Sequence, residues 1–336
     1  MPTYKDTVSK KYGDVLFPAL SIVENTLQSF SVSPAIDIAL SGGIPEGSWV
    51  SFAGPPGCGK TSTALQVMAE SQKPKYNIGG KTRPSFYFDV EHRLKPMNLY
   101  GIHGLNPDNI QIIRSSKERQ LSAQDFLEII KLVIRDPENF GGVAIIDSTS
   151  ALCPHDDLFD EVNGQRRSVM PKIMADFCRQ MAGNVRTSQF TVIMIQHLIT
   201  NTSQYGAKWQ VDGGEKVKYQ ADVQMFTKGK PERWGDDRHP TGQIIEWEVI
   251  KSSLGQSGLS CSSYLKYGYG LDETKEVCNI ATELSVVEKA GSWYKAKVGD
   301  TDYKWHGEEA LYQAVKDDNK LLDHLFTESK KILGIK

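Results

Sequence analysis

The sequence predicts an α/β fold with a mainly parallel central sheet, a short N-terminal arm and a small C-terminal α+β domain. Short apolar segments alternate with segments of helical periodicity, and crossover helices between parallel strands produce this alternation. A glycine-rich loop follows the first apolar segment of the core. Of the 336 residues, 39% are hydrophobic and 24% are charged, which is the composition of a globular protein with a sizeable core.

Three regions are expected along the chain: an arm at residues 1–30, a core at residues 31–270 and a small domain at residues 271–336. A short helix is expected in the arm before Pro18. Strands of the core are expected at residues 48–54, 86–90, 141–148 and 190–197. Helices are expected between them, at residues 61–73, at residues 121–136 and after Pro171.

The apolar segments after Lys218 follow a different pattern from those of the parallel core. The apolar runs at residues 221–229, 242–253 and 262–270 are hairpin-like and predict an antiparallel extension of the sheet. Beyond them the chain becomes helical again at residues 271–291 and 306–334, with a small hairpin between the two helical parts. This change of pattern is the reason for placing a C-terminal domain there.

The overall charge and the cysteines limit the class of protein. A formal net charge of −2 excludes a strongly basic surface, so cations that bind nucleic acid must be concentrated locally. The 5 cysteines include no C-x-x-C pair, which indicates reduced thiols and no zinc site. No apolar stretch approaches the roughly 20 residues of a membrane span, and the N-terminus lacks a signal-peptide core. We therefore expect a cytoplasmic protein with no membrane partner.

The loop "GPPGCGKTS" fits the phosphate-binding pattern G-x-x-x-x-G-K-[ST] through Gly54, Gly59, Lys60 and Thr61. Glycine permits a turn that aims successive N–H groups inward, the next helix adds its positive dipole end, and Lys60 adds a full charge. The Thr61 hydroxyl is a candidate Mg²⁺ ligand. A chance glycine-rich turn is disfavoured because the motif is complete and lies between a strand and a helix. The residues expected around the nucleotide phosphates are Gly54, Pro55, Pro56, Gly57, Cys58, Gly59, Lys60, Thr61 and Ser62.

Such a loop predicts an acidic residue for Mg²⁺ at the end of another strand. The segment "VAIIDS" supplies Asp147, followed by Ser148. Both residue types are also common at a helix N-cap after a strand, and the two roles are compatible. We favour the metal role for Asp147 because Lys60 and Thr61 supply the other half of such a site.

Hydrolysis also needs a group that activates the attacking water, and "FYFDVEH" offers Asp89, Glu91 and His92 at a strand end. Spacing alone does not choose between Asp89 and Glu91. Another strand, "FTVIMIQH", ends in Gln196, which in that position can sense whether a γ-phosphate is present. A solvated polar residue at a strand end explains Gln196 equally well.

Two long polar loops, at residues 154–168 and 197–219, leave from neighbouring strand ends. Loops of this length inside a compact domain are usually functional or disordered. Arginine and lysine suit phosphates, and aromatic side chains can stack on bases or wedge between them. Taken singly, each of these residues is also explained as a solvated charge or a local packing residue. The loop residues that suit nucleic acid are Arg166, Arg167, Tyr205, Lys208 and Trp209.

Together, ordered segments of the chain resemble the RecA family of recombinases, including its phage UvsX-like members. The resemblance runs from about Ser31 to Tyr294. Its segments are "IDIALSGGIPEGSWVSFAGPPGCGKTSTALQV", "FYFDVEH", "VAIIDSTSALCP", "CRQMAGNVRTS", "IMIQH", "DGGEKVKYQADV" and "YGYGLDETKEVCNIATELSVVEKAGSWY". A single phosphate loop is shared by many folds, whereas this ordered set is highly specific.

The resemblance implies a RecA-like P-loop ATPase core that uses ATP and Mg²⁺ and is stimulated by DNA. It implies that the protein polymerises on single-stranded DNA and that the helical filament exchanges strands with homologous double-stranded DNA. Residues 1–30 would pack one protomer on the next. Single-strand-binding and mediator proteins are further expected partners, in the cytoplasm of a bacterial cell or a phage-infected bacterial cell.

By matching motifs, the resemblance assigns catalytic roles to Lys60 and Glu91 and the Mg²⁺ site to Thr61 and Asp147. It assigns to Gln196 the coupling of the γ-phosphate to the DNA loop that begins at the next residue.

The resemblance also implies contacts outside the protomer's own ATP site. Residues that would reach the ATP of a neighbouring protomer are Lys218, Tyr219 and Lys251. Expected DNA-binding residues are Arg166, Arg167, Lys172, Arg179, His197, Tyr205, Gly206, Lys208, Trp209, Gly213 and Gly214.

The chain departs from the family pattern in several places. Ser253 stands where a second lysine is usual, so Lys251 would carry more of the contact with the neighbour. Asn98 stands where bacterial members stack a tyrosine on adenine, with Tyr100 nearby. The final segment "TESKKILGIK" lacks the acidic tail of bacterial members, which is consistent with a phage-encoded protein.

Two alternatives belong to other functional classes. One is a ring-forming DNA motor of the same core fold, such as a helicase, and the other is a filament accessory protein that does not exchange strands. The paired loops and the C-terminal segment argue against the first. Intact Lys60, Glu91 and Asp147 argue against the second.

Overall fold

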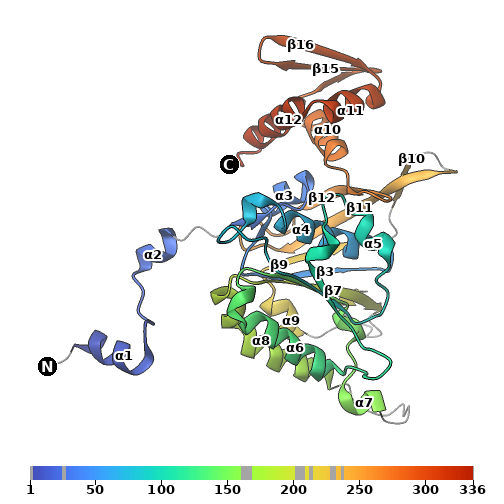
Figure 1. Ribbon diagram of the computed structural model, residues 1–336. Coiled ribbons are helices and arrows are strands. Elements are labelled where there is room, and N and C mark those ends of the chain that lie inside the picture. The colour runs from blue at the N-terminus through green and yellow to red at the C-terminus, as the bar shows by residue number, and fades with distance from the viewer. Residues whose placement is uncertain are drawn as a thin grey trace.

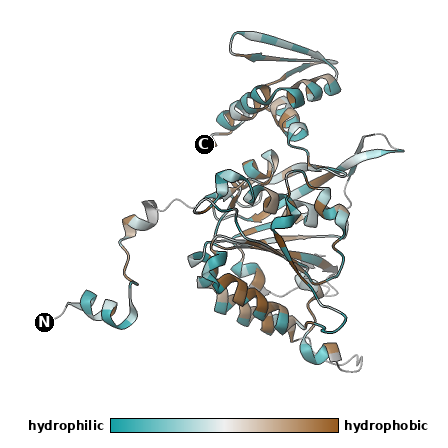
Figure 2. Cartoon of the chain, viewed as in Figure 1, coloured by the Kyte–Doolittle hydropathy of each residue, from teal (hydrophilic) through white to brown (hydrophobic). Residues whose placement is uncertain are grey.

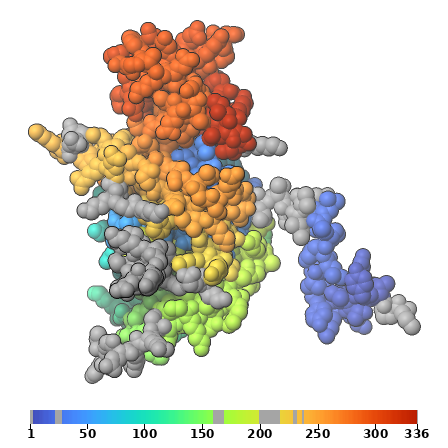
Figure 3. All heavy atoms as spheres, turned by 180° about the vertical axis from the view of Figure 1, so that it is seen from behind, coloured from blue at the N-terminus to red at the C-terminus, as the bar shows by residue number. Residues whose placement is uncertain are grey.

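The computed structural model describes residues 3–24, 28–159, 169–200, 209–211, 215–227, 232–235 and 238–335. Figures 1 and 3 show an N-terminal arm that lies to one side of a central body and apart from it, with the C-terminal part stacked on top of that body. The arm contains helices α1 (Tyr4–Tyr12) and α2 (Ala19–Glu24). Helix α1 begins with a reciprocal cap between Thr3 and Asp6 and buries none of its side chains. It confirms the short helix predicted before Pro18.

The central sheet is mainly parallel, which confirms the predicted α/β fold. Its strand order is β13-β12-β11-β9-β3-β7-β6-β4-β5, with β10 paired to β11 and β8 paired to β7. The strands in the parallel part are β3 (Trp49–Gly54), β4 (Ser85–Asp89), β5 (Ile110–Ile113), β6 (Val143–Asp147), β7 (Thr191–Thr200) and β9 (Val223–Thr227). The antiparallel strands are β8 (Trp209–Val211), β10 (Glu232–Gly235), β11 (Pro240–Lys251), β12 (Ser260–Lys266) and β13 (Gly270–Leu271).

Two strands in the parallel part of the sheet differ from the sequence prediction. Strand β9 was expected in the antiparallel extension, but it pairs parallel to β3, because helix α9 (Glu215–Gln220) returns the chain to the same end of the sheet. Strand β5 was not predicted. It lies at the edge of the sheet, and its apolar run is only four residues long, is interrupted by Gln111 and is partly exposed, so it falls short of the continuous run that predicts a buried strand.

Helices cover both faces of the sheet. In β3, Val50 and Phe52 pack in the cluster that contains α4, whereas Trp49 packs in the cluster that contains α6 and α8. This is the alternation expected of a strand buried on both faces. Figure 2 shows hydrophobic residues concentrated on the strands and on the helices below them. The helices of the core are α3 (Pro34–Leu40), α4 (Lys60–Ser71), α5 (Pro96–Tyr100), α6 (Ala123–Arg135), α7 (His155–Phe159), α8 (Met170–Thr187) and α9.

The remaining short elements complete the body. A small two-stranded sheet pairs β1 (Ser29–Phe30) with β2 (Ile44–Pro45). Short 3-10 helices lie at Pro74–Tyr76, Pro107–Asn109, Pro137–Asn139 and Thr149–Ala151. Among the residues that the structure describes, no helix has the length and apolar character needed to span a membrane.

The C-terminal part has its own hydrophobic cluster, centred on Val277, Leu311 and Leu325. Its hairpin joins β15 (Trp293–Val298) to β16 (Thr301–His306), as the sequence predicts. The other elements are α10 (Glu273–Glu283), β14 (Glu288–Ala290), α11 (Glu308–Asp317) and α12 (Asn319–Ile332). The division of the chain into domains at residues 30 and 270 stays a prediction.

A buried carboxylate joins the C-terminal part to the core. Glu276 of α10 is 1% exposed. Its Oε2 accepts a hydrogen bond from the Ala35 N–H in the first turn of α3 at 2.9 Å, and its Oε1 accepts one from the Tyr264 N–H of β12 at 3.2 Å. Burial raises the pKa of Glu276 to about 7, against the lowering effect of these hydrogen bonds. The carboxyl group therefore titrates near neutral pH in the folded protein.

We expect this junction to weaken as the pH rises. A raised folded-state pKa means that the folded protein holds the proton more tightly than the unfolded chain, so the stabilisation is complete at acidic pH and is lost as the pH rises towards 7. Between pH 5 and pH 7.5, the thermal midpoint of the wild type should fall roughly 5 °C further than that of Glu276→Ala. The exposed Glu283→Ala, on the same helix, is the control. Equal pH dependence of the wild type and Glu276→Ala, followed by circular dichroism, contradicts this prediction.

Candidate functional site

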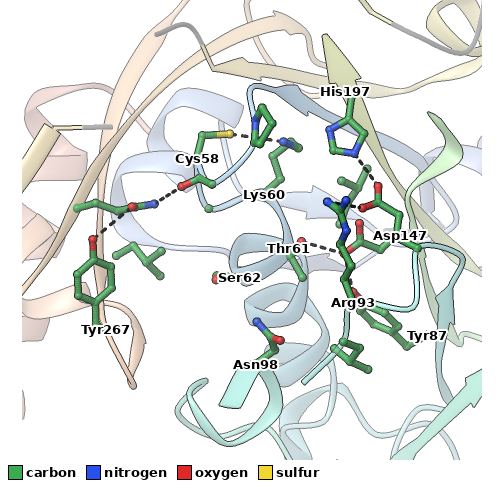
Figure 4. A pocket seen from close by; sticks show the side chains of 18 residues that line it. Cys58, Lys60, Thr61, Ser62, Tyr87, Arg93, Asn98, Asp147, His197 and Tyr267 are labelled. Atoms are coloured by element: carbon green, nitrogen blue, oxygen red, sulfur yellow. Dashed lines mark hydrogen bonds and ion pairs between the residues drawn. The ribbon is translucent and has the colours of Figure 1, made fainter. Parts of the chain in front are cut away.

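The glycine-rich loop lies at the carboxyl end of β3 and leads directly into α4 (Figure 4). Gly57 and Gly59 have φ angles of 73° and 85°, the left-handed region that favours glycine. A Cβ atom at Gly54 would lie 2.3 Å from Cγ2 of Thr227, so the strand and its neighbour pack too closely for a side chain. These contacts give the loop the shape of a phosphate cradle.

A cavity of about 400 Å³ lies against this loop. Its lining includes residues 56–62 and side chains from β4, β6, β7, β11 and β12. Parallel strands of an open sheet bind ligands at their carboxyl ends, which is where β3, β4, β6 and β7 meet the cavity. The cavity is therefore in the position expected for a nucleotide.

Lys60 lies at the first position of α4 and is 5% exposed. Its Nζ donates hydrogen bonds to the carbonyl oxygens of Gly54 at 2.9 Å and Pro55 at 2.7 Å. It also lies 3.6 Å from Sγ of Cys58. A buried ammonium bonded to neutral carbonyl groups places a positive charge beside the loop, which suits a phosphate group.

Thr61 and Asp147 face each other across the floor of the cavity (Figure 4). The Thr61 Oγ1 donates to Oδ2 of Asp147 at 2.8 Å, and the Tyr87 hydroxyl donates to the same oxygen at 2.6 Å. Burial raises the pKa of Asp147, although both hydrogen bonds act in the opposite direction. A hydroxyl and a carboxylate are the oxygen ligands that Mg²⁺ prefers, so the pair fits Mg²⁺.

Glu91 follows the end of β4 and lines the same cavity. Its Oε1 accepts hydrogen bonds from Ser148 Oγ at 2.5 Å and lies 2.6 Å from His197 Nε2, and its Oε2 lies 3.1 Å from Arg93 Nη1. Burial alone would raise the pKa of Glu91, but the hydrogen bonds from Ser148 and His197 outweigh it and lower the pKa. An ionised carboxylate facing the cavity can accept a proton from water.

The structure distinguishes the roles of Asp89 and Glu91, between which the sequence spacing did not choose. Asp89 is 1% exposed and does not line the cavity. Its Oδ1 accepts hydrogen bonds from the backbone N–H groups of Arg93 at 3.0 Å and Leu94 at 3.4 Å. Asp89 therefore shapes the turn after β4, whereas Glu91 faces the cavity.

Strand β7 contains two adjacent polar residues, Gln196 and His197, whose side chains face opposite sides of the sheet. Gln196 is 1% exposed and accepts a hydrogen bond from Ser51 of β3, away from the cavity lining. His197 lines the cavity and contacts Glu91. The alternation of the strand is the signal that predicts this, because His197 shares a face with Ile193 and Ile195, which pack in the α4 cluster.

The residues expected to contact a neighbouring ATP lie together but outside this cavity. Lys251, at the end of β11, donates from Nζ to the carbonyl oxygens of Ala221 at 2.5 Å and Tyr219 at 3.2 Å. Tyr219 is 73% exposed, and Lys218 lies beside it in α9. Ser253 follows on the exposed surface beyond β11. The structure thus groups Lys218, Tyr219 and Lys251 at one place on the molecule.

The expected DNA-binding residues fall partly within the described chain. Lys172 and Arg179 are both exposed on α8, and their spacing of seven residues places them on one face of that helix. Arg179 pairs with Asp176. Trp209 begins β8, which pairs with β7. The candidates that lie outside the described residues are Arg166, Arg167, Tyr205, Gly206, Lys208, Gly213 and Gly214.

Several cavity residues were not among the sequence-predicted site residues. Tyr87 and Arg93 come from β4 and the turn after it, and Gln243 and Tyr267 come from the antiparallel strands and their turn. Gln243 donates from Nε2 to the Gly57 carbonyl at 3.1 Å. No local pattern marks these four residues, because the sheet brings them to the loop from distant positions in the chain. Asn98 also lines the cavity, whereas Tyr100 is 78% exposed.

Comparisons with known proteins identify the family that the chain resembles in sequence. A family model described as the RecA N-terminal domain matches residues 5–272. The chain is 29% identical over 321 residues to Protein RecA of Thermotoga petrophila, covering 93% of this chain and 85% of that protein. It is 27% identical over 336 residues to Protein RecA of Oleidesulfovibrio alaskensis, covering 96% and 90% of the two chains. It is 27% identical over 308 residues to Protein RecA of Porphyromonas gingivalis, covering 90% and 85%.

We expect Lys60→Ala to weaken the binding of ATP by about 100-fold, because it removes a charge-assisted contact with the phosphates. Fluorescence of a labelled ATP analogue measures this affinity. Lys81→Ala is the control, because it removes the same charge from an exposed loop that does not line the cavity. Unchanged affinity of the Lys60 variant contradicts the assignment of the loop.

Proposed function

Because the chain belongs to the RecA family, we propose that it is an ATP-dependent DNA recombinase. In this proposal it forms helical filaments on single-stranded DNA and catalyses homologous pairing and strand exchange. One observation carries the ATPase part: a single cavity brings together Lys60 of the loop, the Thr61–Asp147 pair and the carboxylate of Glu91. These are a phosphate-binding cation, a Mg²⁺ site and a base for water, which together make phosphoryl transfer to water feasible.

The proposed reaction uses the chain's own groups as follows. Lys60 and the loop N–H groups hold the phosphates, and Thr61 and Asp147 provide oxygen ligands for Mg²⁺, which supplies charge neutralisation when bound. Glu91 orients the attacking water and accepts its proton. The lowered pKa of Glu91 keeps the carboxylate ionised and ready for this role at neutral pH.

We also propose a route by which DNA affects the ATP site. His197 of β7 contacts Glu91, and β7 continues to Thr200, after which the chain enters the segment with the proposed DNA residues Tyr205, Gly206 and Lys208. A change in this segment on DNA binding would shift His197 and hence the water-activating carboxylate. Gln196, bonded to Ser51, would anchor β7 to β3 next to this contact.

The proposed DNA contacts combine charge and aromatic character. Lys172 and Arg179 of α8 would bind phosphates from one exposed helix face. The other proposed DNA contacts are Arg166, Arg167, His197, Tyr205, Gly206, Lys208, Trp209, Gly213 and Gly214. Lys218, Tyr219 and Lys251 would contact the ATP of the adjacent protomer in the filament, and residues 1–30 would pack against that protomer.

The function is tested by strand exchange between a circular single strand and a homologous linear duplex. We expect exchange that requires ATP, and ATP hydrolysis that single-stranded DNA stimulates. Glu91→Gln keeps the shape of the side chain but removes the base, so its turnover should fall about 10²–10⁴-fold while ATP binding persists. Glu118→Gln, a change on an exposed loop, is the control. Closed rings in electron micrographs, or DNA-independent turnover without exchange, would contradict a recombinase and favour a ring motor or an accessory protein.

A mixing experiment tests whether the ATP site is shared between protomers. Lys251→Ala keeps its own Glu91, and Glu91→Gln keeps its own Lys251, so each variant alone should be nearly inactive. Mixed on single-stranded DNA, about a quarter of the interfaces should pair an intact Glu91 with an intact Lys251, and activity should partly return. Absence of recovery, with co-assembly verified by crosslinking, rules out a site completed by Lys251 of a neighbour.

A further inference from the structure

Arg93 borders two neighbouring cavities at the proposed phosphate end of the site. The first is the cavity beneath the loop, and the second, of about 470 Å³, lies beside Pro56, Glu91 and His197. Figure 4 shows the Arg93 side chain extending along the cavity wall towards His197. The side chain is 79% exposed, so the guanidinium is accessible from the cavity.

The backbone beneath Arg93 is held rigidly although its side chain is exposed. Buried Asp89 accepts a hydrogen bond from the Arg93 N–H at 3.0 Å, and the preceding residue, His92, has a φ angle of 55°. A left-handed residue next to a side-chain cap defines a tight turn. This turn directs both Glu91 and Arg93 to the cavity, which gives Asp89 a positioning role for both.

The contact between Arg93 and Glu91 is one that a phosphate can replace. An ion pair with one partner so exposed contributes little to stability. The planar guanidinium binds phosphate oxygens through two parallel hydrogen bonds, which are stronger than a single contact with a carboxylate. Glu91 keeps Ser148 and His197 on its other oxygen, so losing Arg93 does not leave the carboxylate without partners.

We propose that Arg93 binds the γ-phosphate of ATP within its own protomer, exchanging its contact with Glu91 for the phosphate oxygens. The proposal rests on the proposed ATPase function and adds a residue to it. Arg93 distinguishes a nucleoside triphosphate from a diphosphate, because the diphosphate lacks the group that it contacts. The exchange also exposes Oε2 of Glu91 to the attacking water only when the triphosphate is present.

The test compares the affinities of ATPγS and ADP, measured by competition with a fluorescent nucleotide in the presence of Mg²⁺ and without DNA. Arg93→Ala should bind ATPγS about tenfold more weakly than the wild type, whereas its affinity for ADP should change by less than about twofold. Arg93→Lys keeps the charge without the planar fork and should recover part of the loss. The matched control is Arg135→Ala, an exposed arginine at the end of α6 that lines neither cavity.

The outcomes separate this proposal from the function on which it rests. If Arg93→Ala loses equal affinity for ATPγS and ADP, or loses affinity for neither, the role of Arg93 is overturned while the nucleotide site stays in place. A wild-type protein that binds neither nucleotide overturns the proposed function itself.

A double-mutant cycle tests the exchange of partners. In the Glu91→Gln variant, Arg93 has no carboxylate partner to give up when it binds the phosphate. Arg93→Ala should therefore lower the affinity for ATPγS by a larger factor in this variant than in the wild type. Additive effects of the two substitutions contradict the exchange. The measurement is a binding affinity, so the loss of turnover in Glu91→Gln does not obscure it.

Discussion

The parallel register of β3, β4, β6 and β7 is the constraint on which the whole site depends. Gly54 is in register with His197, and Asp89 is in register with Asp147. Parallel strands joined by crossover helices must end at the same edge of a sheet, so residues more than a hundred positions apart meet within one cavity. The hydrogen bonds that join Thr61 to Asp147, and Glu91 to His197, exist because this register holds.

The sequence predicted the parts of the fold and of the candidate site that local chemistry determines. The loop from Gly54 to Ser62 and the acid at Asp147 follow from strand-end patterns, and the structure brings Thr61 and Asp147 into contact. The choice between Asp89 and Glu91 needed the turn after β4, whose shape depends on side-chain to backbone hydrogen bonds that spacing does not show.

Other features required the tertiary structure. Gln243 and Tyr267 reach the cavity only because the antiparallel strands continue the sheet past β9, and Glu276 is buried only because α10 packs against α3 and β12. The apolar run of the edge strand β5 is only four residues long and is interrupted by Gln111. Strand β9 is parallel to β3, not antiparallel as predicted, because the short helix α9 returns the chain to the same end of the sheet. Each of these depends on contacts between segments far apart in the chain, which neither periodicity nor motif spacing determines.

Strand β11 runs from the glycine-rich loop of the cavity to the group of residues proposed to contact a neighbouring ATP. Near its beginning, Gln243 donates a hydrogen bond to the Gly57 carbonyl of the loop, and at its end Lys251 is held by the carbonyl oxygens of Ala221 and Tyr219. Eight residues of extended strand cover about 27 Å. Strand β11 pairs with β12 as far as Glu248 and with β9 from Trp247, with a register shift between Val249 and Lys251. In a filament in which Lys251 contacts the next ATP, this strand would connect the loop of one ATP site to the neighbouring site. Successive ATP sites would then be mechanically linked in series, and a displacement at one loop would be transmitted along the filament axis without any change in the fold.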